Sequence, residues 1–287
     1  MSQKIVVGKG RSALNALDLC FDVDATGSMQ PWIDRVRALI TDIADTVTKS
    51  ATEPDLRLAL VEYRDHGSSR GKDSPTRTNG FTSDVRRFRK ELSSVSCGGG
   101  ADAPEAVSDG LVEALGLPWR RQAQKVVVLV GDAPPHGAGS PGDSYPKGCP
   151  CGRAPESIAD SLRKAGIVLH SIAVTDDPFT LASFRDLAEI ADGEFFRLTD
   201  GRRLGDALGA IVRSEGRKVA DDLAVAAGYE ASGGDVMRLS RMTGLSSEDV
   251  DKSIDRLRAK AAVVPVADRV DPPAETRDRP GRVRVIR

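Results

Sequence analysis

Residues 17–29 read LDLCFDVDATGSM, an apolar run that ends abruptly in a polar turn. A mostly apolar stretch of this length is typical of a strand that is buried in a parallel sheet. Pro31 follows at a position where a helix can begin, and apolar residues then recur at helical spacing as far as Val47. The order of strand, polar loop and helix is the basic unit of an α/β fold.

The same order recurs along the chain. Further apolar strands are predicted over residues 56–63, 125–130, 167–174 and 194–198. Helices are predicted between and after them, over residues 103–115, 158–165, 178–191 and 203–214. Residues 67–80 are predicted to be a loop, and 81–92 a short strand or turn followed by a helix. Strands that alternate with helices predict a Rossmann-like, doubly wound α/β fold with a mostly parallel sheet.

The chain of 287 residues divides into four predicted segments. Residues 1–13 form a lead-in or edge strand, and residues 14–218 form the α/β domain. Residues 219–262 are predicted to be a small helical appendage. Residues 263–287 carry Pro and Arg without periodicity, so we expect a disordered tail.

Composition argues against several classes of function. The formal net charge is −1 and aromatic residues make up 4% of the chain, so we expect neither a basic field nor a base-stacking surface for nucleic acid. No stretch approaches the ~18 apolar residues of a membrane span, and the start of the chain lacks the pattern of a signal peptide. The four cysteines do not follow the C-x2-C spacing of a metal knuckle, so we expect reduced thiols and a cytoplasmic location.

Three predicted strand ends carry polar loops. The first loop holds Asp24, Thr26 and Ser28, the second is CGGGADAPE at 97–105, and the third begins at Asp132. Ligands of an open parallel sheet bind at the carboxyl ends of its strands. Carboxylate and hydroxyl oxygens spaced by two residues along a tight loop can face one point, and such hard ligands suit Mg²⁺, Mn²⁺ or Ca²⁺.

These loops resemble the metal ion-dependent adhesion site of von Willebrand factor A domains. The resemblance covers roughly residues 15–215 and is strongest to the A domains linked to alpha-kinases, although we expect no kinase domain in this chain. The similar stretches are DATGSM at 24–29, YRDH at 63–66, FTSDV at 81–85, GGGADAPEAVSDGL at 98–111, LPWR at 117–120 and DAPPHG at 132–137.

The resemblance implies a set of cation ligands and a function. Asp24, Thr26 and Ser28 would be first-loop ligands, and Asp132 would be the third-loop ligand. The implied function is that of an adaptor or scaffold and not of an enzyme. It would bind a protein partner through an Asp or Glu of the partner that reaches the open position of a bound Mg²⁺, Mn²⁺ or Ca²⁺.

This chain departs from the family pattern in two places. The second loop of the family often offers a threonine just before PEA, but Ala103 stands there and has no side-chain oxygen. Asp102 precedes it and is the candidate replacement ligand. Asp22 lies in the first strand at a position that is usually apolar, on the same strand face as Asp24.

Two further histidines and an aspartate lie at strand ends on the same edge of the predicted sheet. They are Asp65, His66 and His136, and we expect them to form a rim that contacts the partner or, for Asp65 and His66, to make a hairpin turn instead. His136 is also a candidate ligand for a softer metal, together with Cys149 and Cys151 of the long 137–155 loop, although no fourth ligand is evident.

The first loop leaves an enzyme as an alternative. Asp22 and Asp24 also resemble the DxDxT start of haloacid dehalogenase-type phosphatases, in which Asp22 would be the nucleophile and Asp24 the acid/base, with Mg²⁺ as a charge clamp. Those enzymes need a later GDxxxD motif. Here Gly131 and Asp132 are followed by His136 where the second aspartate should stand.

The C-terminal segment leaves a DNA-binding regulator as another alternative. Residues 235–257 resemble a helix-turn-helix, with a turn around Gly244 and Ser246 as the cap of the second helix. That helix begins with Glu248 and Asp249, and acids at this position would repel the phosphates of DNA. The charge therefore favours a helical docking element over a nucleic-acid partner.

Overall fold

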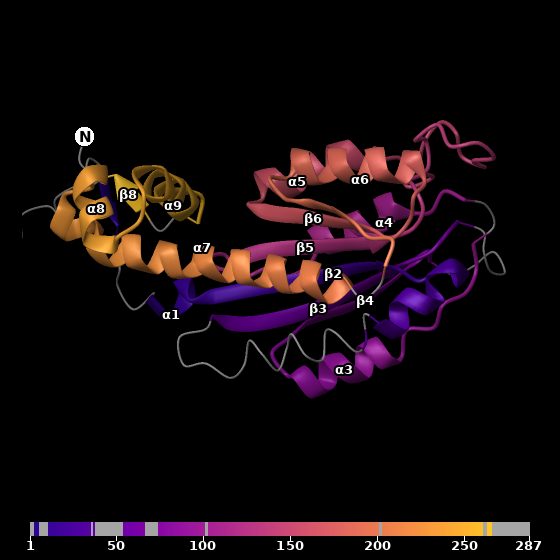
Figure 1. Ribbon diagram of the computed structural model, residues 1–287, viewed down its shortest axis with the longest axis horizontal. Coiled ribbons are helices and arrows are strands. Elements are labelled where there is room, and N and C mark those ends of the chain that lie inside the picture. The colour runs from indigo at the N-terminus through magenta and orange to yellow at the C-terminus, as the bar shows by residue number, and fades with distance from the viewer. Residues whose placement is uncertain are drawn as a thin grey trace, which may run out of the picture.

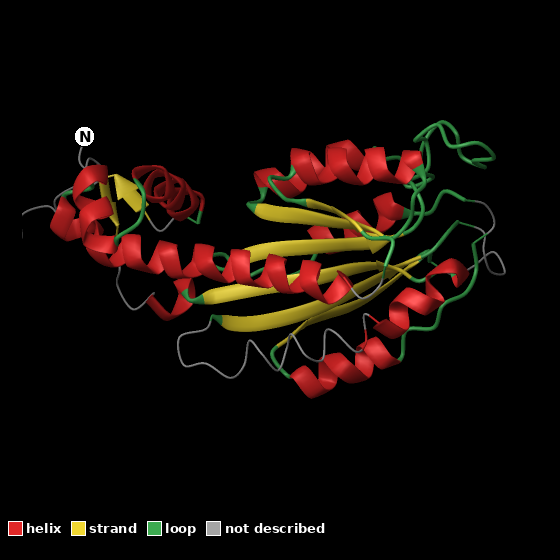
Figure 2. Ribbon diagram, in the orientation of Figure 1, coloured by secondary structure: helices red, strands yellow, loops and turns green. Residues whose placement is uncertain are grey.

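The computed structural model describes residues 3–5, 11–35, 37, 54–66, 74–100, 103–200, 203–260 and 263–265. A six-stranded sheet in the order β4-β3-β2-β5-β6-β7 forms its centre, with helices on both faces (Figures 1 and 2). The strands are β2 (Ala16–Asp24), β3 (Asp55–Tyr63), β4 (Thr76–Thr82), β5 (Gln124–Gly131), β6 (Ile167–Ala173) and β7 (Phe195–Arg197). All neighbours pair in parallel except β3 and β4. The predicted Rossmann-like, mostly parallel α/β fold is confirmed.

The antiparallel edge strand β4 corrects one prediction. Residues 67–80 were expected to be a loop, which is wrong for residues 76–80, because these pair with β3 from Tyr63↔Thr76 to Leu60↔Asn79. This part of β4 reads TRTNG, and its side chains are half-buried or exposed. An edge strand with no buried face shows no apolar alternation, so hydrophobic pattern alone does not reveal it.

Helices cover both faces of the sheet, and successive residues of β2, all of them buried, point to opposite faces. Leu19 and Phe21 pack with α3 (Val85–Ser93) and α7 (Leu204–Ser232) on one face. Cys20 packs on the other face, where the covering helices are α4 (Val107–Leu115), α5 (Pro155–Lys164) and α6 (Pro178–Ile190). None of the described helices combines the length and apolar character needed to cross a membrane.

The C-terminal helices pack on the far half of α7, which extends beyond the sheet (Figure 1). α8 (Val236–Thr243) and α9 (Ser247–Ala259) are the two helices predicted over 235–257. Together with α1 (Arg11–Leu14) they enclose a separate apolar cluster that includes Tyr229, Leu239 and Leu257. The predicted boundary between residues 218 and 219 falls inside α7, so the appendage continues a helix of the sheet domain.

The two ends of the described chain meet beside these helices. β1 (Gln3–Ile5) pairs antiparallel with β8 (Val263–Pro265), and this small ribbon is separate from the main sheet. The predicted lead-in therefore holds a strand whose partner comes from the start of the predicted tail. The remainder of that tail, residues 266–287, lies outside the described residues.

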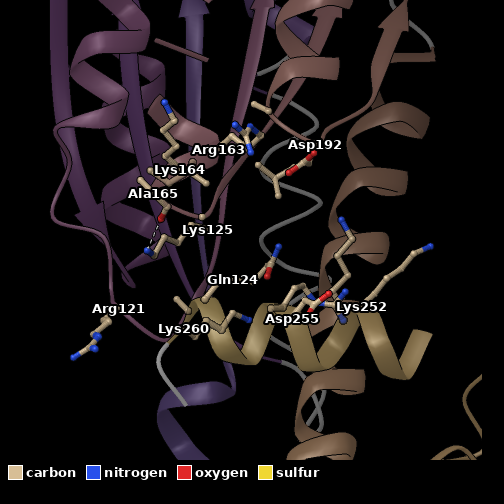
Figure 3. Close-up of a pocket in the computed structure, with 18 residues that line it drawn as sticks. Arg121, Gln124, Lys125, Arg163, Lys164, Ala165, Asp192, Lys252, Asp255 and Lys260 are labelled. Carbon is tan, nitrogen blue, oxygen red and sulfur yellow. Dashed lines mark hydrogen bonds between the residues drawn. The ribbon is translucent and has the colours of Figure 1, made fainter. Parts of the chain in front are cut away.

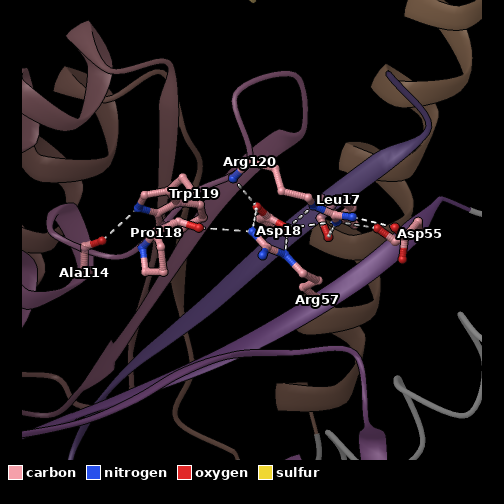
Figure 4. Close-up of polar contacts among 8 residues, drawn as sticks. All are labelled: Leu17, Asp18, Asp55, Arg57, Ala114, Pro118, Trp119 and Arg120. Carbon is pink, nitrogen blue, oxygen red and sulfur yellow. Dashed lines mark hydrogen bonds and ion pairs between the residues drawn. The ribbon is translucent and has the colours of Figure 1, made fainter. Parts of the chain in front are cut away.

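A buried carboxylate secures the amino-terminal edge of the sheet (Figure 4). Asp18 of β2 accepts two hydrogen bonds from Arg57 of β3, at 2.9 and 2.6 Å. It also accepts from the backbone N of Arg120 at 2.8 Å and from its Nε at 2.9 Å. Trp119 donates its indole N–H to the Ala114 carbonyl at 2.9 Å. The LPWR stretch is thus a packing element at the edge opposite to the polar loops.

Candidate functional site

A chain of side-chain oxygens joins the first and third loops at the carboxyl-terminal edge of the sheet. Asp24 ends β2, and its Oδ1 accepts hydrogen bonds from the Thr26 backbone N at 2.8 Å and from Thr26 Oγ1 at 2.6 Å. Thr26 Oγ1 lies 3.2 Å from Ser28 Oγ, which donates to Asp132 Oδ1 at 3.1 Å. The structure therefore brings four of the five expected ligand residues together. The fifth, Asp102, lies outside the described residues.

The glycines of the second loop let it approach the first loop closely. The Gly98 N–H donates to the Ala25 carbonyl at 3.0 Å. Gly100 has a φ of +94°, and a Cβ there would lie 3.2 Å from Glu105 Oε1 and 3.8 Å from Thr26 Cβ. A side chain at this position would be strained and crowded. Ala103, which replaces the expected threonine, is exposed.

Negative charge accumulates around this oxygen cluster. Burial, and then the charge of Asp132, raise the pKa of Asp24 to about 7. Burial also raises the pKa of Tyr63 well above its usual range, and the carboxylates of Asp24, Asp22, Glu105 and Asp132 raise it further. Within the described part of the chain, neither Asp24 nor Asp132 forms an ion pair with a basic side chain.

These residues fit a hard divalent cation. Asp24 Oδ2 is buried and has no hydrogen-bond partner among the described residues. A buried carboxylate oxygen without a partner is costly, and a cation is one group that would relieve the cost. The donors are carboxylates and hydroxyls, which are the ligands that Mg²⁺, Mn²⁺ and Ca²⁺ prefer.

Asp22 lies beneath this cluster, and its surroundings do not support the phosphatase alternative. Its carboxylate is fully buried under α4, where a Cβ on Gly110 would lie 2.5 Å from Oδ1. Burial, and then the charges of Asp24 and Glu113, raise the pKa of Asp22 well above its usual range. A nucleophile must be ionised and reach its substrate, whereas burial disfavours the charged form of Asp22 and leaves its carboxylate inaccessible.

The three residues expected on the partner-binding rim differ in exposure. His136 Nε2 shares a hydrogen bond with Asp65 Oδ1 at 3.1 Å, and its Nδ1 shares one with Asp143 Oδ1 at 2.9 Å. His136 and Asp65 are buried, which leaves them no surface for a partner. They instead tie the end of β3 to the 137–155 loop. His66 keeps 15% of its side chain exposed.

The expected group of His136, Cys149 and Cys151 is not formed. The side chain of Cys149 contacts His66 and Asp109 instead, and Cys151 Sγ lies 3.8 Å from the Arg153 carbonyl oxygen. Sequence spacing did not reveal Asp109 or Asp143. Asp109 lies 43 residues from His66 along the chain, and Asp143 meets His136 across a turn of the 137–155 loop.

A cavity of about 770 Å³ lies at the opposite edge of the sheet, where β5 and β6 begin (Figure 3). Eight Lys or Arg and two Asp are among its 18 lining residues. Much of the basic charge is already engaged: Lys260 is paired with the buried Asp222 at 2.8 Å, and Arg163 with Asp160 at 2.6 Å. Lys125 donates to the Ala165 carbonyl at 3.0 Å. None of the residues that line this cavity belongs to the oxygen cluster around Asp24, so the two are separate features.

Gly131 provides space for Tyr63 beside Asp24, and this contact yields a stability prediction. A Cβ at residue 131 would overlap the Tyr63 hydroxyl and lie 3.2 Å from the Phe184 ring. Gly131→Ala is expected to lower the free energy of unfolding by about 1–3 kcal/mol through overpacking. Tyr63→Phe alone should change it by less than about 1 kcal/mol, because the hydroxyl lacks a hydrogen-bond partner in the described structure.

The double variant should regain most of the stability lost in Gly131→Ala, since removal of the hydroxyl makes room for the new Cβ. Urea unfolding of the four proteins measures this coupling. If the stability losses of the two single variants simply add in the double variant, the residue 131 Cβ does not overlap the Tyr63 hydroxyl.

Part of the chain is similar in sequence to known proteins. Residues 18–138 match the family profile of the von Willebrand factor A domain. The chain is 33% identical over 146 residues to Alpha-protein kinase vwkA of Dictyostelium discoideum, a match that covers 50% of this chain and 23% of that protein. The chain thus spans about a quarter of that relative.

Solved structures share the fold at low sequence identity. The pilus adhesin SpaC from Lactobacillus rhamnosus GG has a TM-score of 0.54 and 13% identity, over 70% of this chain and 30% of that chain. The von Willebrand factor type A protein from Catenulispora acidiphila has a TM-score of 0.50 and 15% identity, over 70% of this chain and 42% of that one.

Proposed function

We propose that this chain binds a protein partner through a divalent cation held between Asp24, Ser28 and Asp132, because residues 18–138 match the family profile of the von Willebrand factor A domain. Domains of this family are generally protein-interaction modules. The observation that carries the proposal is the cluster of hydroxyl and carboxylate oxygens that contains the partnerless buried Oδ2 of Asp24.

Each residue of the cluster has a part in holding the cation. Thr26 fixes the Asp24 carboxylate with two hydrogen bonds to Oδ1, which leaves Oδ2 to face the cation. Ser28 is exposed and Asp132 is half-exposed, so the cluster opens to solvent on their side. We infer that Asp102 contributes from the second loop. The bound cation, Mg²⁺ or else Mn²⁺ or Ca²⁺, supplies positive charge and a coordination position for an Asp or Glu of the partner.

The proposal is binding rather than catalysis. The one nucleophile that the sequence offered, Asp22, is buried under Gly110. Alpha-protein kinase vwkA is named for an activity, but this chain spans only 23% of that protein, so the activity is not carried over.

The C-terminal helices support docking better than DNA binding. Arg256 and Lys260 of this region are paired with the buried Asp222, at 2.7 and 2.8 Å, and are therefore not free for phosphates. Glu248 and Asp249 occupy the first turn of α9, the end that would enter a DNA groove.

Affinity capture with the full chain tests the proposed function. Proteins from an extract of the source cells should be retained in Mg²⁺, released when Mg²⁺ is removed and retained again when it returns. Asp24→Ala should lose them, because one charged ligand of the cation is gone. Asp251→Ala, which removes an exposed carboxylate from α9, is the matched control and should keep them. Equal retention without Mg²⁺ and by Asp24→Ala would contradict the proposal.

A further inference from the structure

A second group of ligand-type side chains lies near the carboxyl-terminal edge of the sheet. His66 follows β3, Asp109 is in the first turn of α4, and Cys149 comes from the long loop between β5 and α5. Figure 1 labels these four elements. His66 Nε2 lies 3.0 Å from Asp109 Oδ2 and 3.2 Å from Cys149 Sγ. Cys149 Sγ lies 2.8 Å from Asp109 Oδ2. All three candidate ligand atoms are within 4.8 Å of one another.

We propose that His66, Asp109 and Cys149 form a Zn²⁺ site that is distinct from the hard-cation cluster around Asp24. An imidazole nitrogen, a thiolate and a carboxylate oxygen are the three ligand types that zinc takes in proteins. The cluster around Asp24 offers oxygens alone. Ligand softness therefore assigns different metals to the two sites, since thiolate and imidazole select Zn²⁺ over Mg²⁺.

The spacing of the three atoms agrees with a tetrahedral ion. Bonds of about 2.0–2.3 Å at tetrahedral angles place ligand atoms about 3.3–3.6 Å apart. The three observed separations are 2.8, 3.0 and 3.2 Å. The distance between the two atoms of each pair would need to increase by less than about 1 Å, and small side-chain rotations are enough for that. Three protein ligands leave the fourth position to solvent.

The proton balance of the site is simple. Without a cation the Cys149 thiol donates its hydrogen to Asp109 Oδ2. Burial and this hydrogen bond raise the pKa of the thiol above its usual range. Binding of Zn²⁺ forms a zinc–sulfur bond and releases that proton to solvent.

Neighbouring side chains hold the ligands in place. The ring of His66 packs against the rings of His136 and Tyr145, with centroids 5.7 Å away in each case. His136 is itself held by Asp65 and Asp143. The backbone N–H of Cys151 donates to Cys149 Sγ at 3.5 Å. Zinc would thus join the 137–155 loop to β3 and α4, and so fix the loop that follows Asp132.

Titration of the metal-free full chain with Zn²⁺, in excess Mg²⁺ and against a chromophoric chelator, tests this site. We expect one Zn²⁺ per chain at micromolar affinity or tighter, and a rise in melting temperature on binding. Cys149→Ser and His66→Ala should each weaken Zn²⁺ binding at least about 100-fold. Loss of a residue that only hydrogen-bonds to a ligand weakens binding by at most about that factor, so a larger loss marks a direct ligand. Cys97→Ser removes a thiol elsewhere and should bind as the wild type does.

Two further measurements keep the outcome decisive. Co²⁺ bound to the wild type should show a thiolate-to-metal charge-transfer band, which needs no variant to fold. Asp24→Ala should bind Zn²⁺ normally, so failure of the Mg²⁺ site would not be mistaken for failure of this one. Stoichiometric Zn²⁺ binding that survives Cys149→Ser, or a Co²⁺ complex without the thiolate band, would overturn the proposal.

Discussion

Asp18→Ala is expected to lower the free energy of unfolding by about 3–5 kcal/mol. The side chain of Asp18 is fully buried, and those of Arg57 and Arg120 are 24% and 26% exposed. Removal of the carboxylate leaves two partly buried guanidinium groups without the acceptor that joins β2, β3 and the LPWR stretch. Breaking a buried ion pair from one side is costly because the remaining charge stays desolvated.

Asp55→Ala is the matched control for this prediction. Asp55 also pairs with Arg120, at 2.5 Å, but its side chain is 64% exposed. An exposed pair of this kind contributes less than about 1 kcal/mol. Urea unfolding monitored by circular dichroism compares the two variants. Losses of similar size would show that the Asp18 cluster does not secure this edge of the sheet.

Asp24→Ala is expected to abolish stabilisation by Mg²⁺. At a Mg²⁺ concentration of about 100 times Kd, the wild type should gain about 2.7 kcal/mol, or about 5–10 °C in melting temperature. The variant should show no such rise, because it lacks a charged ligand. The stability of the variant without metal should fall little. The substitution removes two hydrogen bonds between Thr26 and residue 24, but it also removes the charge repulsion between Asp24 and Asp132.

Asp24→Asn separates the charge of the ligand from its shape. The amide can keep the Oδ1 hydrogen bonds to Thr26 while it removes the negative charge. It should therefore also lose most of the Mg²⁺ response. A melting temperature of the wild type that is indifferent to millimolar Mg²⁺, Mn²⁺ and Ca²⁺ alike would contradict a cation site here.

The sheet was predictable from sequence because its central strands are buried on both sides. The apolar runs at 17–23 and 125–130 mark β2 and β5 directly. β4 was not predictable in this way, since TRTNG carries no apolar signal and becomes a strand through its pairing with β3. The continuity of α7 through residue 218 was also missed, because Gly216 follows the predicted helix end at residue 214, and a glycine in that place is a typical signal for the end of a helix.

The candidate site was predictable where its residues are close in sequence. Asp24, Thr26 and Ser28 lie on one tight loop, and Asp132 follows the strand beside β2. The contacts of His66 and His136 were not predictable, because each takes a partner from a distant segment. His66 meets Cys149 across 83 positions of the chain, and the sequence alone paired that cysteine with His136 instead.

Anomalous scattering data from crystals grown with Mn²⁺ would locate the cation in the proposed site. Mn²⁺ is a hard cation that substitutes for Mg²⁺, and its anomalous signal marks its position without ambiguity over water. We expect a peak between the side chains of Asp24, Ser28 and Asp132, and the loss of that peak in Asp24→Ala. Mn²⁺ peaks elsewhere, with the Asp24 cluster holding none at saturating Mn²⁺, would contradict the proposed site.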